Sequence, residues 1–222
     1  MTPRFRIEPT DRTLIVGHTG SGKTTLALEL IRGYRSLVVI DPKWRVQVPG
    51  AGVISGSPRA FAQWWPQRIR RVIYRPDPRL RRHEDVDEVI GRVLAYGRTC
   101  LYVDEAMELA SPGAILPAYK RAITQGRELY VPVVSASQRP VGIHNTILTE
   151  AEHCFAFKLT SSGDRDKLAA FYGDDAGAVI LEPFAFLYAG TRTGGVVYRC
   201  PPLELGAGPR AAPEPTSEAA AQ

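Results

Sequence analysis

The sequence is poor in cysteine and contains no long apolar run. Its three cysteines, Cys100, Cys154 and Cys200, are far apart and odd in number, which argues against a disulfide framework or a zinc site. No stretch approaches the roughly 18 apolar residues that span a bilayer. The first residues lack the apolar core of a signal peptide. We therefore expect a soluble protein with reduced thiols in a cytosol-like compartment.

Lysine is also scarce, although the chain is mildly basic. The net charge is +5, and the lysines are only Lys23, Lys43, Lys120, Lys158 and Lys167, so arginine supplies most of the 28 basic residues. Arginine suits bidentate contacts with phosphate, but a GC-rich genome would produce the same bias. At 222 residues and 44% hydrophobic content, the chain is long enough to bury the core of a single α/β domain.

One glycine-rich run stands out. Gly17 to Thr24 reads G-H-T-G-S-G-K-T and fills the phosphate-binding pattern GxxxxGK[ST]. An apolar run (14–16) precedes it, and a helix-forming run (24–32) follows it and stops at Gly33. In a strand–loop–helix unit of this kind, backbone N–H groups surround a polyphosphate at the positive end of the helix. The alternative is a chance glycine loop before a helix, and we interpret the run as a site for a nucleoside triphosphate.

This interpretation gives the loop residues their roles. Lys23 would reach the β- and γ-phosphates, and the Thr24 hydroxyl would ligate Mg²⁺. The expected cofactors are therefore ATP and Mg²⁺. The residues expected to hold the nucleotide are Gly17, His18, Thr19, Gly20, Ser21, Gly22, Lys23, Thr24 and Thr25.

Along the chain, apolar β-branched runs alternate with helical patterns, which predicts βαβ units and a parallel sheet. We expect strands at 14–16, 36–40, 71–74, 100–103, 131–135 and 154–159. We expect helices at 24–32, 59–65, 84–96 and 117–127, another opening near 164, and a terminal hairpin over 185–188 and 196–198. Residues 1–200 would form one domain, and the Pro- and Ala-rich residues 201–222 a disordered tail.

Two adjacent carboxylates, Asp104 and Glu105, follow the apolar run 100–103. The carboxyl ends of strands are where ligands of parallel α/β sheets bind. An NTPase needs one carboxylate to hold the Mg²⁺ shell and another to orient or deprotonate the attacking water. We assign these roles to Asp104 and Glu105, respectively. The alternative is that Asp104 and Glu105 only cap the helix that follows them.

A third polar strand end is Ser137-Gln138. If its strand lies between the other two, Gln138 would fall beside the γ-phosphate, where it can hold the attacking water. Taken alone, Gln138 would be an ordinary strand-end residue.

With these motifs in place, the sequence resembles the FtsK/HerA superfamily of hexameric DNA-pumping ATPases. The similarity lies in Q-G-R-E-L-Y-V-P-V-V-S-A-S-Q-R-P (125–140), in I-D-P-K (40–43) and in F-K-L-T-S-S-G-D-R-D (157–166). The resemblance implies a RecA-like (ASCE) P-loop fold, with a mostly parallel central sheet flanked by helices. It also implies a homo-hexameric ring acting on double-stranded DNA. The family often has Gly-Glu soon after I-D-P-K, where this chain has Trp44-Arg45.

The length is similar to that of the minimal genome-packaging ATPases of membrane-containing, double-jelly-roll viruses. We therefore expect an ATP-hydrolysing double-stranded DNA translocase that packages a viral genome. It would work in the host cytoplasm or at a virion vertex, with capsid or membrane proteins as further partners. The alternatives are a HerA-like translocase or helicase working with a nuclease, and a morphogenesis ATPase that does not touch DNA.

Ring ATPases of this type complete each site with an arginine from the neighbouring subunit. The Gly-Arg pair of the resemblance assigns this role to Arg127, with Arg121 and Arg139 as the other candidates. For Arg127 the alternative is a plain cation at a helix C-terminus, which the macrodipole favours.

Seven further arginines crowd residues 68–82. This segment is either a surface that tracks phosphates, a site for a capsid or membrane partner, or a solvated face. Nearby Trp64 and Trp65 are candidates for the core, a subunit interface or base stacking. The seven arginines are Arg68, Arg70, Arg71, Arg75, Arg79, Arg81 and Arg82.

Overall fold

One large β-sheet organises the molecule. The computed structural model describes residues 7–77, 79, 82–180, 182–191, 193–203 and 214–215, and the account below is confined to them. The strands of this sheet are β1 (Arg12–Val16), β2 (Leu37–Ile40), β3 (Gly52–Ser55), β4 (Arg71–Arg75), β5 (Cys100–Val103), β8 (Val133–Ser137), β9 (His153–Phe157), β10 (Phe186–Gly190), β11 (Tyr198–Cys200) and β12 (Glu214–Pro215). A separate small hairpin consists of β6 (Ala110–Ser111) and β7 (Ala114–Ile115).

The α-helices lie between the strands in the chain. They are α1 (Lys23–Ile31), α2 (Pro58–Trp64), α3 (Arg82–Tyr96), α4 (Pro117–Gln125), α5 (Asn145–Glu150) and α6 (Ser162–Tyr172). Three short 3₁₀ turns accompany them: η1 (Ala106–Glu108), η2 (Pro140–Gly142) and η3 (Asp174–Gly177).

The strand order across the sheet is β12-β11-β10-β9-β1-β8-β5-β2-β4-β3. From β3 to β9 neighbouring strands pair in parallel, whereas β10, β11 and β12 pair antiparallel. The expected mostly parallel sheet with a C-terminal hairpin is therefore confirmed. The strand β8 lies between β1 and β5, as the prediction for Gln138 requires.

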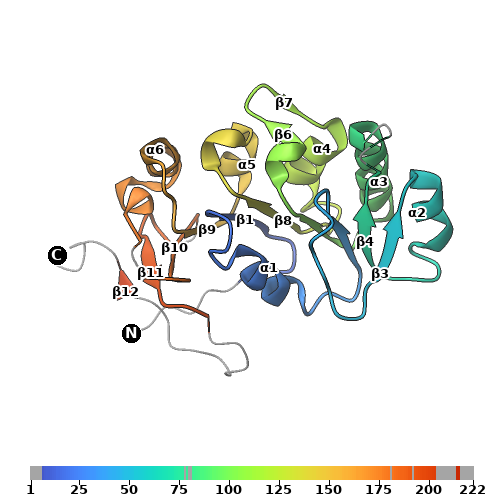
Figure 1. Ribbon diagram of the computed structural model, residues 1–222, viewed down its shortest axis with the longest axis horizontal. Helices are drawn as coiled ribbons and strands as arrows, with labels where there is room; N and C mark the ends of the chain where they lie inside the picture. Colours follow the sequence, from blue (N-terminus) through green and yellow to red (C-terminus); the bar gives the residue numbers. More distant parts are fainter. Residues whose placement is uncertain are drawn as a thin grey trace.

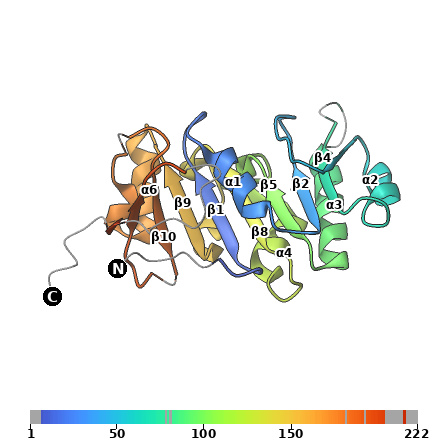
Figure 2. The same ribbon diagram turned by 90° about the horizontal axis from the view of Figure 1, so that it is seen from below.

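Helices cover both faces of the sheet (Figures 1 and 2). Helix α1 packs alone on one face, where its Leu26 and Ala27 join Ile15 in a buried cluster. Helices α3, α4, α5 and α6 line the other face, and their apolar residues cluster with Leu14 and Val16. The residues of β1 therefore alternate between two cores, as the period of a strand requires.

Helix α3 shows how the pattern of the sequence produces this packing. Its buried residues recur at helical spacing and point to the sheet, and two acids, Glu84 and Asp85, occupy its first turn. Gly97 follows the helix with φ 71°, in the left-handed region. A Cβ at Gly97 would come within 2.9 Å of the Leu129 carbonyl oxygen, so glycine is needed there.

Several elements differ from the expectations. The sequence pattern did not predict β3, the β6–β7 hairpin or α5, because each is short and carries little periodicity. The strand expected at 131–135 instead runs from Val133 to Ser137. The tail expected over 201–222 lies outside the described residues except for 201–203 and 214–215.

A membrane-crossing helix is not found among the residues described, because none of their helices is both long and apolar enough.

Candidate nucleotide-binding and catalytic site

The glycine-rich loop joins β1 to α1 at the carboxyl edge of the sheet. Its first residues are fixed to both neighbouring strands: the Gly17 N–H donates to the Ser137 carbonyl at 3.2 Å, and the His18 N–H donates to the Lys158 carbonyl at 3.1 Å. A Cβ at Gly17 would lie 2.6 Å from Phe157 Cβ, and Gly22, directly before α1, has φ 106°. Both positions therefore require glycine, and the loop leaves the N-terminus of α1 facing a cavity.

Lys23 is the first residue of α1, and its side chain turns back over the loop. The Lys23 Nζ donates to the His18 carbonyl oxygen at 2.9 Å. Burial lowers the pKa of the Lys23 ammonium, and the nearby charges of Glu105 and Asp104 partly oppose this effect. A partly desolvated cation of this kind interacts strongly with an incoming phosphate.

A cavity of about 120 Å³ lies between the loop and the ends of β2, β5 and β8. It brings together residues that are far apart in the sequence, because the carboxyl ends of parallel strands meet at one edge of the sheet. Its lining residues are Thr19, Gly20, Lys23, Thr24, Lys43, Arg45, Val46, Asp104, Glu105 and Gln138.

Asp104 directly follows β5 and is held by its own strand. Its Oδ1 accepts a hydrogen bond from the Tyr102 hydroxyl at 2.8 Å. Burial raises the pKa of the Asp104 carboxyl, whereas the Tyr102 hydrogen bond acts in the opposite direction. A bound cation would reverse this effect, because it favours the charged carboxylate.

The oxygen donors of Thr24 and Asp104 fit a hard cation such as Mg²⁺. The described part of the chain contains no cluster of three or more His, Cys, Asp or Glu side chains that could hold a metal by itself. Mg²⁺ does not need such a cluster, because one or two carboxylates, waters and substrate phosphates complete its octahedron.

Glu105 is the most constrained carboxylate of the site. Its backbone is left-handed, with φ 63°, and its side chain is 7% exposed. The Gln138 amide Nε2 donates to Glu105 Oε2 at 2.8 Å, and the Gln138 backbone N–H donates to Oε1 at 3.3 Å. Glu105 and Gln138 are thus joined directly, and both border the place expected for the γ-phosphate.

Lys43 is a site residue that the sequence reasoning did not assign. Its Nζ donates to Glu105 Oε2 at 2.8 Å, so that oxygen is shared between Lys43 and Gln138. The signal for Lys43 was present in I-D-P-K, but the contact depends on β2 lying next to β5.

Asp41 fixes the loop that carries Lys43. This buried carboxylate accepts the N–H groups of Arg45 and Val46 at 3.0 and 3.1 Å, and the Arg75 Nε at 3.0 Å. The loop containing Trp44-Arg45, whose role the sequence left open, is therefore anchored to the end of β4. Arg45 itself lines the cavity.

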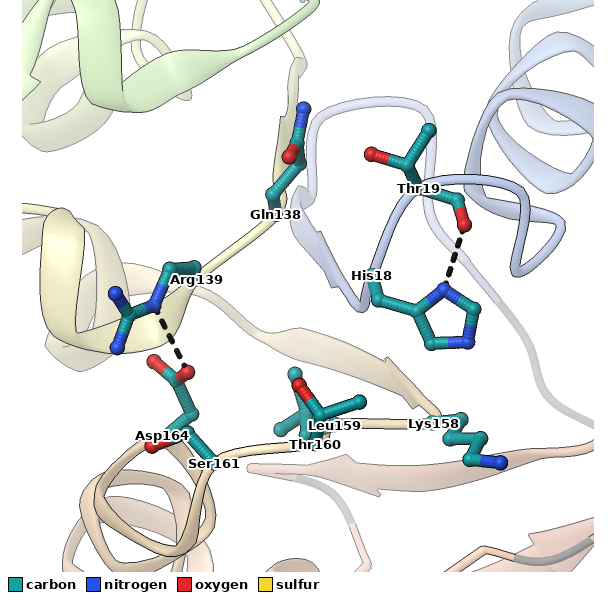
Figure 3. A pocket seen from close by; sticks show the side chains of 9 residues that line it. All are labelled: His18, Thr19, Gln138, Arg139, Lys158, Leu159, Thr160, Ser161 and Asp164. Atoms are coloured by element: carbon teal, nitrogen blue, oxygen red, sulfur yellow. Dashed lines mark hydrogen bonds and ion pairs between the residues drawn. The ribbon is translucent and has the colours of Figure 1, made fainter.

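A larger cavity of about 780 Å³ adjoins the first one and shares Thr19 and Gln138 with it (Figure 3). Residues after β8 and β9 and the start of α6 form its other walls. The Arg139 Nε lies 3.1 Å from Asp164 Oδ2, across one side of the cavity. The glycine-rich loop thus borders a cavity on each side. Arg139, a candidate for the trans arginine, already pairs with a carboxylate of its own chain.

Arg127 is far from these residues. It follows α4 and precedes β8, so it lies at the amino edge of the sheet, opposite the glycine-rich loop. There its Nη1 is 3.8 Å from Glu152 Oε1, and its side chain is 56% exposed. Arg121 lies on α4 and is exposed. Neither arginine reaches the cavity of its own chain, and the assignment of Arg127 as a trans residue stays a prediction.

The arginine-rich segment is not one patch. Strand β4 runs through it and separates Arg68 and Arg70, at the amino edge, from Arg79 and Arg82, at the carboxyl edge. Arg82 pairs with Glu108 at 3.4 Å. Inside β4, Arg71 donates to the Tyr34 carbonyl and Arg75 contacts Asp41. Arg81 lies outside the described residues.

The two neighbouring tryptophans also separate. Trp65 is a core residue, stacked on Phe61 with ring centroids 5.1 Å apart. Trp64 remains exposed on the surface.

Comparison with known proteins decides the family. The family model described as an AAA domain matches residues 10–138, which is more than half of the chain. The chain belongs to the AAA-domain family. It is a P-loop ATPase with a nucleotide-binding site, as the glycine-rich loop predicted.

Individual relatives of this AAA-domain protein include packaging enzymes. The DNA packaging ATPase P9 of Enterobacteria phage PRD1 is 26% identical over 176 residues, covering 78% of this chain and 74% of P9. The genome packaging NTPase B204 of Sulfolobus turreted icosahedral virus 2, solved with AMPPCP, has a TM-score of 0.72 at 17% identity, covering 89% of this chain and 100% of B204. The pCW3 conjugation coupling protein TcpA has a TM-score of 0.56 at 12% identity, covering 82% of this chain and 58% of TcpA. The expected resemblance to minimal packaging ATPases is confirmed.

Proposed function

We propose that the protein hydrolyses ATP to move double-stranded DNA during viral genome packaging. The observation that carries the proposal is the meeting of the glycine-rich loop, Asp104, Glu105 and Gln138 around one cavity. The names of two similar proteins, a DNA packaging ATPase and a genome packaging NTPase, support the substrate and the process.

In this proposal the loop residues 17–25 bind the phosphates of ATP through backbone N–H groups and Lys23. Thr24 and Asp104 would hold Mg²⁺, which neutralises charge on the phosphates. Glu105 accepts the proton of the attacking water, and Gln138 orients that water. The direct contact between Gln138 and Glu105 supports this division, because both groups must reach one water molecule.

The same proposal includes a ring. Arg127 lies at the sheet edge opposite its own nucleotide site, so it can serve only the site of another copy. An association that joins one edge to the opposite edge of the next copy is heterologous, and it forms a ring when the rotation between successive copies closes. We propose a homo-hexamer, in which Arg127 neutralises transition-state charge in the neighbouring site.

We further propose that residues 1–200 form one ATPase domain. The protein would act in the host cytoplasm or at a virion vertex, and capsid or membrane proteins would hold it there. These assignments follow from the packaging role.

A triplex-displacement assay tests the function. A labelled third strand is bound to a linear duplex, and its release is followed with native protein, ATP and Mg²⁺. We expect release that requires ATP and that stops in the Glu105→Gln variant. ATP hydrolysis without release on any duplex would instead favour an ATPase that does not translocate DNA.

A further inference from the structure

Three exposed arginines lie over exposed aromatic rings along the amino edge of the sheet. Their guanidinium carbons are 5.2 Å from the Trp64 ring, 5.9 Å from the Tyr96 ring and 5.2 Å from the Tyr130 ring, within the range of cation–π attraction. The rings are 44%, 42% and 57% exposed, respectively. We name this surface the arginine–aromatic belt, and its members are Trp64, Arg68, Arg70, Tyr96, Arg98 and Tyr130.

The members of the belt are continuous in space. They precede the amino ends of β4, β5 and β8 in the chain. In the sheet these strands lie close together, in the order β8-β5-β2-β4. The Arg70 Nη1 donates to the Tyr96 hydroxyl at 2.6 Å, and the Arg98 N–H donates to the Leu129 carbonyl at 3.0 Å. Figure 2 shows the ends of α3 and α4, which lead into the belt, on the same side of the sheet.

The arginines of the belt stand apart from the carboxylates that the structure describes. Among the residues that the structure describes, Arg68, Arg70 and Arg98 form no ion pair with a carboxylate. Arg75, from the same segment of the sequence, does pair, with Asp41. The belt therefore presents a row of charges that the chain itself leaves open.

The backbone of the belt is also strained. Arg98 and Tyr130 have φ 47° and φ 55°, in the left-handed region that side chains with a Cβ rarely adopt. Both conformations are held by backbone hydrogen bonds, from the Arg98 N–H to Leu129 and from the Tyr130 N–H to Arg127 at 3.1 Å. Strain of this kind persists where the surrounding structure imposes it, and it is common at functional surfaces.

The composition of the belt fits a protein partner better than the DNA backbone. Trp, Tyr and Arg are the residues that anchor protein–protein interfaces. Contacts with phosphates are made by cations and by neutral hydrogen-bond donors, and they leave the exposed face of the Trp64 ring without a role. The belt also continues into Arg127, whose carbonyl binds the Tyr130 N–H.

We infer that the arginine–aromatic belt docks on the nucleotide edge of a second copy of this chain. The belt arginines complement that edge when it holds ATP, because the nucleotide is a polyanion. In such a contact Arg98, beside Arg127, faces the site of the next copy, and the rings exclude water around it. This inference rests on the proposed ring and adds the surface that closes it.

Charge reversal with a matched control tests the belt. Arg68→Glu/Arg98→Glu reverses two belt charges, while Arg92→Glu/Arg199→Glu makes the same charge change at exposed arginines outside the belt. Native mass is measured by light scattering with ATP-γ-S and Mg²⁺, and nucleotide affinity by titration. We expect the belt variant to remain monomeric and to bind nucleotide within about twofold of native, consistent with an intact own-chain site. The control should assemble as the native protein does.

Mixing identifies the partner as a second copy. The belt variant keeps its own site, and the Glu105→Gln variant keeps its belt. Their mixture should hydrolyse ATP about tenfold faster than either alone, a small part of the 10³–10⁵ that an arginine in trans supplies.

Two results would overturn the inference: a belt variant with native mass and turnover, or a native protein that stays monomeric with every nucleotide. Neither the mass measurement nor the mixing experiment contains DNA. A failure of DNA stimulation would therefore count against the packaging role alone.

Discussion

The two edges of the sheet arrange their charged groups differently. At the carboxyl edge Lys23, Lys43, Asp104 and Glu105 surround a cavity, so their charges face open space. At the amino ends of β1 and β9 the charges are buried against one another, as in the pair Arg12–Glu152. The comparison indicates that the carboxyl edge is built to receive a charged ligand, whereas the buried network at the amino ends of β1 and β9 mainly stabilises the fold.

The amino-edge network extends deep into the molecule. The Arg12 guanidinium contacts Glu150 at 2.9 Å as well as Glu152. Beside it, the buried His153 ring contacts Asp11 Oδ2 and the Tyr188 hydroxyl, each at 2.8 Å. These groups join β1, β9 and β10 at the end of the sheet that does not bind nucleotide.

The largest effect is expected from Lys23→Ala. This change removes the mobile cation of the phosphate loop, so hydrolysis should be abolished and nucleotide binding strongly weakened. Steady-state turnover and equilibrium titration measure the two effects. Turnover close to the native value would contradict the assignment of the carboxyl edge as the nucleotide site.

Arg127→Ala tests whether the two edges work together across subunits. We expect hydrolysis to fall by about 10³-fold while ATP still binds, because the lost charge acts only on the transition state of another copy. Mixing this variant with Lys23→Ala should restore part of the activity. A mixture that stays inactive, together with normal hydrolysis by Arg127→Ala alone as a monomer, would refute the trans role.

Glu105→Gln separates chemistry from binding at the carboxyl edge. The variant keeps the shape of the side chain and leaves Asp104 in place, so ATP should bind while hydrolysis slows by about 10²–10⁴-fold. Asp104→Asn serves as the contrast and should weaken Mg²⁺-dependent binding. If both variants lose that binding equally, the proposed division of roles is wrong.

Arg12→Met tests the stabilising role of the amino edge. The Arg12 and Glu152 side chains are 13% and 8% exposed, and removing Arg12 leaves the buried Glu152 carboxylate with the more distant Arg127, at 3.8 Å, as its cationic partner. We expect the free energy of unfolding to fall by about 3 kcal/mol. Nucleotide affinity, measured below the unfolding transition, should stay at the native value.

The same pair gives stability a dependence on pH. Burial raises the pKa of the Glu152 carboxyl, but its hydrogen bonds with Arg12 outweigh burial and hold the pKa below 4.5. The stabilisation is present above the pKa of the unfolded chain and is lost as pH falls through the folded pKa. Denaturant unfolding should therefore show a decline of stability below about pH 5 that is weaker in Arg12→Met.

The smallest effect is expected from a double-mutant cycle of Lys43→Met and Gln138→Ala. Both native side chains contact Glu105 Oε2, so their effects on the rate of hydrolysis should not add, with a coupling of about 1 kcal/mol. The pair Arg92→Ala and Gln138→Ala is the matched control. Additive effects in the first cycle would mean that Lys43 does not position Glu105.

The sequence predicted much of the carboxyl edge because motifs there follow strands directly. Gly17, Asp104 and Gln138 each come next after an apolar run, and parallel strands bring such positions to one edge. The contact of Lys43 with Glu105 could not be predicted in this way, because it depends on which strands are neighbours.

The amino edge was harder to predict. Arg68 and Arg79 belong to one basic run in the sequence, yet β4 separates them to opposite edges. Arg98 and Tyr130 come together only through the pairing of segments before β5 and β8. The composition shows that arginine is abundant, but only the fold shows which arginines form ion pairs with carboxylates.

The rate of ATP hydrolysis with and without double-stranded DNA tests the central claim most directly. Native protein is assayed with Mg²⁺ and increasing duplex of unrelated sequences, with Glu105→Gln as the background. We predict that every duplex stimulates turnover to a similar extent, because a packaging motor contacts the backbone. Hydrolysis that no duplex changes, by a protein that does not bind DNA at low salt, would contradict the account.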